Sequence, residues 1–153
     1  MPNTTRRFTA TLTESGARAF VELPFDPDEA WGPAERHYVA GRVAGRPFRG
    51  ALAATALGHV LPLGPTWRRD NGLAPGDTID VELAPEGPLI ASLAPDIADA
   101  LAADAAAASC FRSVAPFYRK NFLRWIDGAK RPETRAARIA ETVQLLAAGR
   151  IER

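Results

Sequence analysis

The stretch that decides the fold is Tyr118–Arg138, with the sequence YRKNFLRWIDGAKRPETRAAR. Its first half places apolar residues at positions i, i+4, i+7, i+8 and i+11, which is the spacing of one apolar helix face. These residues are Tyr118, Phe122, Trp125, Ile126 and Ala129. Pro132 must interrupt that helix, because a proline inside a helix costs about 3 kcal/mol. The stretch therefore predicts two helices that form an antiparallel or steeply crossed pair.

The segments on either side of this stretch extend the helical pattern. Pro116 is placed to begin the first helix of the pair and Pro132 the second, since proline is well tolerated in the first helical turn. Gly149 is placed to end the second helix. The apolar stripe predicted for the second helix consists of Ala136, Ile139, Ala140, Val143, Leu146 and Ala147. Upstream, Asp96 and Asp104 are predicted N-caps of two further helices, from Pro95 to about Ala102 and from there to about Ser113.

The N-terminal part of the chain has the period of two that is typical of β-strands. Six short strands are predicted, the first two as a hairpin over residues 7–22, with helical turns at residues 66–73 and near Trp31. A final short strand is an option at 89–93. We predict an α+β fold, with a small Greek-key-like β-barrel over residues 1–94 and a helical segment over residues 95–153 that ends in the helical hairpin. A sandwich is the alternative to the barrel.

Length and composition are those of a folded soluble protein. The 153 residues include 46% apolar and 24% charged side chains, and they suit one domain or two very small ones. No apolar run is long enough to cross a bilayer, so we predict a cytoplasmic protein without membrane insertion. Cys110 is the single cysteine, which excludes an intramolecular disulfide and a cysteine zinc site. It is predicted to be a packed helix residue, with a reactive thiol as the alternative. No metal or cofactor motif is present.

Basic charge is concentrated in one region. The whole chain has a net charge of +1, whereas residues 112–138 alone carry eight basic and two acidic side chains. Three interpretations follow. The cations can form a solvated face with local ion pairs such as Asp127 with Arg131. They can bind nucleic acid through phosphates, although a pI of about 8.0 and the lack of a reading motif make that partner unlikely.

The third interpretation is an anion or peptide site in a crease between barrel and helices. Aromatic side chains would form its walls, basic side chains would pair with a carboxylate or phosphate, and the amides at the Pro132 helix start would add to the site. The candidate ligand-binding residues are Lys130, Arg131, Arg135, Arg138, Trp125 and Tyr118.

The sequence contains weaker evidence for an enzyme than for a binding protein. The sequence contains no nucleophile elbow, no phosphate loop and no metal-ligand spacing, so no catalytic residue is assigned. His37 and His59 lie on predicted strands, where a single histidine is usually a packed or exposed polar residue. The alternative is an enzyme, such as a cyclase or isomerase, that uses the barrel cavity with Arg49, His59 and Trp67.

Several segments, taken in order, resemble known families. PDIADAL at 95–101, YRKNFLRWIDGAKRPETRAARI at 118–139 and LAAGR at 146–150 are similar to the bacteriocin-protection family, also called YdeI or OmpD-associated proteins. LPFD at 23–26, GRPFRGAL at 45–52 and LAPGDTIDVEL at 73–83 resemble the small β-barrel domain of unknown function that often precedes it. One departure is the adjacent pair Phe117 and Tyr118, where a polar basic run is expected.

This resemblance implies a bacterial, cytoplasmic protein associated with resistance to antimicrobial peptides or stress. The family supplies no catalytic residues. The sequence therefore favours a non-enzymatic binding or protection protein for an anionic small molecule or peptide, with a cavity enzyme and a nucleic-acid binder as alternatives.

Overall fold

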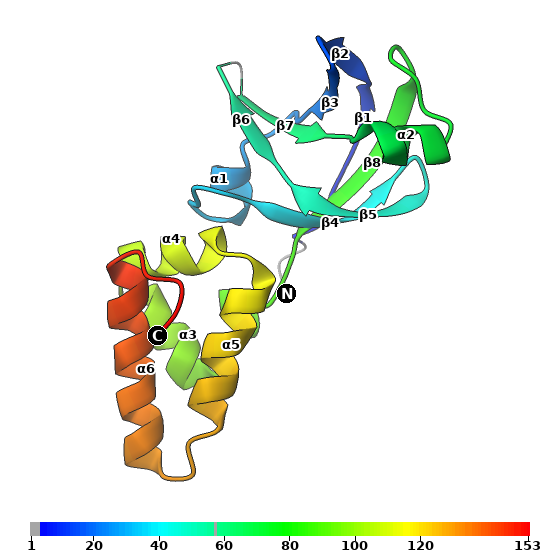
Figure 1. The fold of residues 1–153 in the computed structure, drawn as a ribbon. Helices are drawn as coiled ribbons and strands as arrows, with labels where there is room; N and C mark the ends of the chain where they lie inside the picture. Colours follow the sequence, from blue (N-terminus) through cyan, green and yellow to red (C-terminus); the bar gives the residue numbers. More distant parts are fainter. Residues whose placement is uncertain (1–3, 57) are drawn as a thin grey trace. The chain divides into compact units, whose positions relative to one another are not determined.

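The protein is described by a computed structural model that covers residues 4–56 and 58–153 (Figure 1). The chain divides into two compact units. Of the described residues, the sheet unit contains those up to Trp31 together with those in Arg36–Pro85, and the helical unit contains Gly32–Glu35 and Glu86–Arg153. An α+β fold with antiparallel strands first and helices last is confirmed.

The described residues of the sheet unit form two four-stranded antiparallel sheets, in place of the six strands predicted. One has the strand order β1-β8-β4-β5 and the other β2-β3-β7-β6. The strands are β1 Arg6–Thr11, β2 Thr13–Ser15, β3 Arg18–Glu22, β4 Tyr38–Val43, β5 Arg46–Ala51, β6 Ala53–Thr55, β7 Gly58–Pro62 and β8 Thr78–Pro85. The closed Greek-key-like barrel stays a prediction.

Two predicted strands are each divided at a buried leucine. Leu12 is 1% exposed, and its backbone bonds to Asp77 and Gly76, while Leu52 donates its N–H to the carbonyl of His37. The chain leaves one sheet before each leucine and joins the other sheet after it, as at the corners where strands switch sheets. The predicted hairpin over 7–22 is therefore shorter than expected: β2 pairs with β3, whereas β1 pairs with β8.

The core of the sheet unit follows the alternation of the strands. Val21, Val39, Val43, Leu61 and Leu83 are fully buried, and they meet side chains from both sheets in one cluster. The helices α1 (Pro27–Trp31) and α2 (Pro65–Asp70) cover this core with their tryptophans. Helix α2 ends at Asp70 with Asn71 as its C-cap residue, and of the predicted left-handed pair only Gly72 has a positive φ, of 67°.

Gly41 fixes the closest approach between two strands. A Cβ atom at this position of β4 would lie 1.9 Å from the Glu82 carbonyl oxygen of β8. Because that oxygen belongs to a paired strand, it cannot move without breaking the ladder.

We predict that Gly41→Ala destabilises the sheet unit by more than about 2 kcal/mol through overpacking. Gly64→Ala is the matched control, because a Cβ there meets no atom within 4 Å. Urea unfolding followed by circular dichroism measures both free energies of unfolding. Equal stabilities of the two variants would contradict the close β4–β8 contact.

The helical unit contains four α-helices and one 3-10 turn within the described residues. They are η1 Ile90–Ser92, α3 Pro95–Ala102, α4 Ala105–Ser113, α5 Pro116–Asp127 and α6 Pro132–Ala147. The three helix starts at prolines are confirmed, and the Asp104 side chain caps α4 by accepting from the Ala107 N–H. Figure 1 shows α5 and α6 as the antiparallel pair.

Three details of the helical prediction are wrong. The optional strand at 89–93 is the turn η1, since Ser92 and Leu93 donate back to carbonyls three residues earlier. The N-cap of α3 is Ala94 instead of Asp96. On α6 the buried residues are Ile139, Thr142 and Leu146, whereas the predicted alanines Ala136, Ala140 and Ala147 are exposed.

The shift of the α6 face has a simple cause. Alanine buries little area, so the larger Ile139 and Leu146 set the face. Thr142 can join them because its hydroxyl donates to the Arg138 carbonyl one turn earlier, at 2.8 Å.

The most buried charge of the helical unit is Arg119 of α5, which is 3% exposed. Its guanidinium donates to the carbonyl oxygens of Val114 (3.0 Å), Glu86 (2.6 Å), Pro88 (3.2 Å) and Arg112 (2.8 Å). It also lies over the Phe111 ring, 5.7 Å from the ring centroid. The Arg119 side chain therefore joins residues 86–88, which precede η1, to the end of α4.

We predict that Arg119→Lys lowers the free energy of unfolding by about 3 kcal/mol. A lysine has three donors on one atom and cannot reach four separated carbonyls, and hydrogen bonds from charged groups contribute about 1.5–3 kcal/mol each. The exposed neighbour Lys120 is the control, since Lys120→Ala should change stability by less than about 0.5 kcal/mol. Chemical denaturation of both variants tests this, and a fully stable Arg119→Lys protein would contradict it.

Candidate functional site

Arg135, one of the predicted ligand-binding residues, is held by two carboxylates. Its guanidinium donates to Asp96 at 2.6 and 3.0 Å and to Asp127 at 2.9 Å. The hydrogen bond from Arg135 lowers the pKa of Asp96, and the two carboxylates raise the pKa of Arg135. Asp127 thus pairs with Arg135 instead of the predicted Arg131. Arg135 links α3, α5 and α6.

Arg138 and Trp125 are in direct contact. Arg138 donates to the Trp125 carbonyl oxygen at 2.7 Å, and its guanidinium carbon lies 5.3 Å from the centroid of the Trp125 ring. The helical unit therefore brings two of the six predicted residues together.

The other predicted residues lie apart from this contact. Lys130 and Arg131 are exposed in the turn before α6, where Arg131 is the N-cap residue. Tyr118, near the start of α5, is half-buried and packs edge-on against Phe117. Phe117 itself is 63% exposed, so the adjacent aromatic pair widens the apolar surface at this end of α5.

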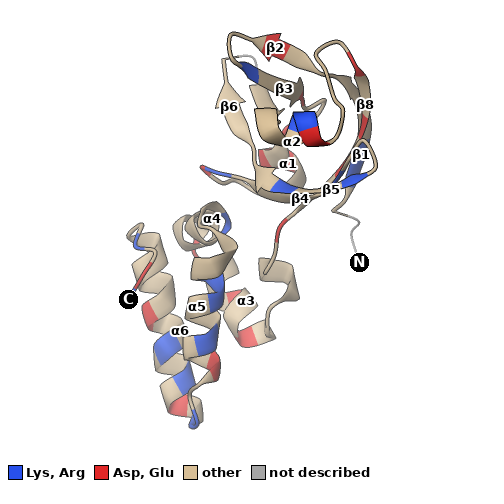
Figure 2. Cartoon of the chain, turned by 45° about the vertical axis from the view of Figure 1, so that its right-hand side comes forward, with Lys and Arg blue, Asp and Glu red and all other residues tan. Residues whose placement is uncertain are grey.

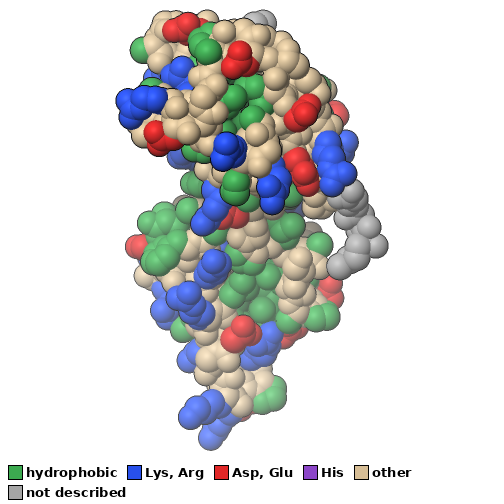
Figure 3. Space-filling view, turned by 90° about the vertical axis from the view of Figure 1, so that its right-hand side faces the viewer, with side chains coloured by type: hydrophobic (Ala, Val, Ile, Leu, Met, Phe, Trp, Pro, Cys, Tyr) green, Lys and Arg blue, Asp and Glu red, His purple; other side chains and the backbone are tan. Residues whose placement is uncertain are grey.

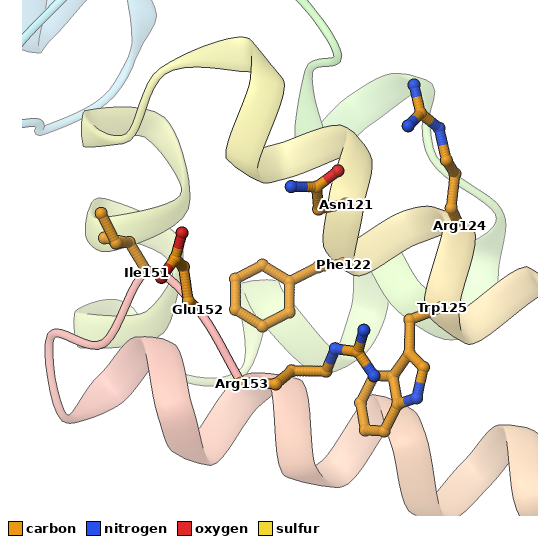
Figure 4. A pocket seen from close by; sticks show the side chains of 7 residues that line it. All are labelled: Asn121, Phe122, Arg124, Trp125, Ile151, Glu152 and Arg153. Atoms are coloured by element: carbon orange, nitrogen blue, oxygen red, sulfur yellow. The ribbon is translucent and has the colours of Figure 1, made fainter.

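A groove of about 620 Å³ opens beside Trp125 (Figure 4). Helix α5 forms one wall with Asn121, Arg124 and Trp125, and residues 151–153 form the other. In Figure 4 the Arg153 side chain extends toward the Trp125 indole, and its guanidinium carbon lies 4.6 Å from the ring centroid. Trp125 is therefore in contact with two arginines, and Arg124 borders the same groove.

The sequence analysis missed Arg153 and the wall it belongs to. Gly149, predicted as the helix end, has a φ of 78°, and Arg150 donates back to the Leu145 carbonyl. This left-handed end turns the chain back along the helices. Gly149 thus indicated that the residues after it could return to α5, but it did not indicate which helix face they would contact.

Charges along the helical unit are mixed with apolar surface. Figure 2 shows Lys and Arg along α5 and α6 and acidic residues on α3, and Figure 3 shows hydrophobic side chains beside the basic ones. Of the eight basic residues between 112 and 138, four are bonded to protein oxygens: Arg112, Arg119, Arg135 and Arg138. The phosphate-binding surface considered from sequence therefore has fewer available cations.

In the sheet unit, the cavity residues of the enzyme alternative have different surroundings. Arg49 is exposed, and Trp67 packs edge-on against Phe48 over the core. His59 lies 5.7 Å from His37 between ring centroids. His37, which is 6% exposed, bonds to Asp28 through Nε2 at 2.6 Å.

Three further features of the described residues concern the Cys110 thiol, metal binding and membrane spans. Cys110 is half-buried, and burial, with Glu35 nearby, raises the pKa of its thiol. Among residues 4–56 and 58–153, no group of three His, Cys, Asp or Glu side chains is arranged to hold a metal ion. Within the same residues, none of the helices has the length and apolar character needed to cross a membrane.

The two units correspond to two known families. A domain of two antiparallel sheets is followed by a helical unit whose last two helices each begin at a proline. This order of domains defines the class of protein. Residues 91–149 match the family described as bacteriocin-protection, YdeI or OmpD-associated, and residues 8–83 match a domain of unknown function, DUF1905. The chain thus matches DUF1905 in its first part and the bacteriocin-protection, YdeI or OmpD-associated family in its second, as the sequence resemblance implied. No curated protein matches the chain significantly.

The Asp96–Arg135 pair makes a pH prediction. Because the folded-state pKa of Asp96 is lowered, its contribution to stability is present above the unfolded pKa, about 4, and is lost as the pH falls through that value toward the folded pKa. We expect wild type to lose more stability than Asp96→Asn between pH 6 and about pH 3.

The measurement is urea unfolding across this pH range. Asp99→Asn, which removes a carboxylate from the same helix and leaves the Asp96–Arg135 pair in place, is the control. In an Arg135→Gln background, Asp96→Asn should change the pH dependence less than in wild type, because only the backbone N–H groups of Ile97 and Asp96 then lower the pKa of Asp96. An unchanged pH profile for Asp96→Asn would contradict the pair.

Proposed function

We propose that this protein is a non-enzymatic binding protein whose helical unit binds an anionic group of a small molecule or peptide in the groove beside Trp125. The observation that carries the proposal is the position of the Arg153 guanidinium over the Trp125 ring, with Arg124 lining the same groove. A guanidinium that stacks on a ring keeps its N–H donors in its own plane, where a carboxylate or phosphate can accept two of them.

The surroundings of the groove support the same ligand chemistry. Glu152 is the one acidic residue that lines it, against Arg124 and Arg153. Trp125 and Ile151 supply apolar surface for the body of a ligand. Small-molecule sites combine such apolar walls with a few placed polar groups. Asn121 adds an amide that can donate to or accept from the ligand.

This proposal narrows the site expected from sequence. Trp125 remains in it, and Arg138 contacts the carbonyl oxygen and the ring of Trp125 without lining the groove. Lys130, Arg131, Arg135 and Tyr118 do not line this groove. For the sheet unit, we propose that the two sheets close as a barrel-like scaffold, which the sheet changes at Leu12 and Leu52 support.

The test is a titration with benzoate, followed by ¹H–¹⁵N NMR of the three tryptophan indole N–H groups. Benzoate should shift the Trp125 signal, while the Trp31 and Trp67 signals serve as internal controls. Benzamide has the same shape without the charge and should bind at least about tenfold more weakly, since a charged hydrogen bond contributes about 1.5–3 kcal/mol.

Variants separate the groove from the general positive charge. Arg153→Ala should weaken benzoate binding about tenfold, whereas Lys130→Ala removes the same charge outside the groove and should leave binding unchanged. Equal binding of benzoate and benzamide, or equal effects of the two variants, would refute the site. The nucleic-acid alternative makes a separate prediction, because the affinity of the protein for a nucleic acid would then fall steeply between low and moderate salt.

A further inference from the structure

The sheet unit contains a second cavity, of about 470 Å³, against the sheet β2-β3-β7-β6. Its floor is apolar. Phe20 of β3 pairs with Pro62 of β7, and Val60 of β7 pairs with Ala53 of β6, so these four residues are neighbours on the sheet. All four line the cavity.

This apolar floor is separate from the core of the unit. Val21 and Leu61, the sequence neighbours of Phe20 and Val60, are fully buried in the core cluster. Since side chains alternate along a strand, Phe20 and Val60 belong to the opposite face. Val60 is only 5% exposed although it lies outside the core cluster. The sheet thus has apolar side chains on both faces, where a solvated face would be polar.

Two arginines border the cavity, and none of the described residues that line it is acidic. Arg18 is an exposed residue at the start of β3. Arg68 of α2 is half-buried, and its Nε donates to the Leu63 carbonyl oxygen at 3.0 Å, which fixes the guanidinium at the cavity. The charge of the lining is therefore complementary to an anion, while most of the surface is complementary to hydrocarbon.

We propose that this cavity binds a small amphipathic carboxylate, with its hydrocarbon part on Phe20 and Val60 and its carboxylate at Arg18 and Arg68. The volume lies within the range of about 300–1,000 Å³ that small-molecule sites occupy. Arginine suits the carboxylate because two N–H groups of its planar guanidinium can donate to the two carboxylate oxygens. This site is independent of the groove beside Trp125.

The test is isothermal titration calorimetry of the full chain with hexanoate, heptanoate and octanoate. Each added methylene should raise the affinity about threefold to fourfold as it is buried. Octanamide, which keeps the chain length and lacks the charge, should bind at least tenfold more weakly than octanoate. An affinity that does not depend on chain length, or equal binding of octanamide and octanoate, would overturn the proposal.

Two variants locate the site. Arg18→Glu should weaken octanoate binding at least tenfold, whereas Arg46→Glu makes the same charge change on an exposed arginine of β5 in the other sheet and should not. Ala53→Phe should block the cavity, with circular dichroism and a thermal melt confirming that it folds. If Arg18→Glu and Arg46→Glu behave alike, or octanoate shifts the Trp125 indole signal instead, the cavity is not the binding site.

Discussion

The helical unit depends on one buried cation. The carbonyls of Arg112 and Val114 lie at the end of α4, where a helix leaves its last acceptors without partners inside the helix. Arg119 supplies donors to both, together with the carbonyls of Glu86 and Pro88. A positive charge is also favourable at this end of the helix dipole. The position of α5, and with it the wall of the Trp125 groove, follows from this one contact set.

The same chemistry explains why the basic stretch is not a uniform surface. Arginine carries several donors on a planar group, so one side chain can join separate segments. Arg119 joins backbone carbonyls, Arg135 joins two carboxylates, and Arg138 holds both the carbonyl and the ring of Trp125. The number of cations available to a ligand therefore depends on which arginines already make contacts within the fold, and not only on how many the sequence contains.

The sequence predicted those features that depend on local geometry. Pro116 and Pro132 mark helix starts, Asp104 marks a cap, and Gly149 marks a helix end, because each residue acts on its own backbone. Interactions between distant segments were not predictable in this way. The burial of Arg119 depends on carbonyls 33 and 31 residues away, and the contact of Arg153 with Trp125 depends on the path of the chain after Gly149. The sheet changes at Leu12 and Leu52 were missed because a period of two continues through each bend.

The Asp28–His37 pair is the arrangement in the sheet unit that most resembles catalytic chemistry, and its geometry favours a structural role. A general base needs a ring nitrogen within hydrogen-bond reach of a substrate proton. In His37 the Nε2 atom is bonded to Asp28, and the ring lies between Trp31 and His59 with 6% of the residue exposed. The pair joins α1 to the start of β4, next to the carbonyl that Leu52 bonds where β5 gives way to β6. The Asp28–His37 hydrogen bond therefore stabilises the corner where the chain changes sheets. Ligand binding is better sought where arginines lie beside open apolar surface.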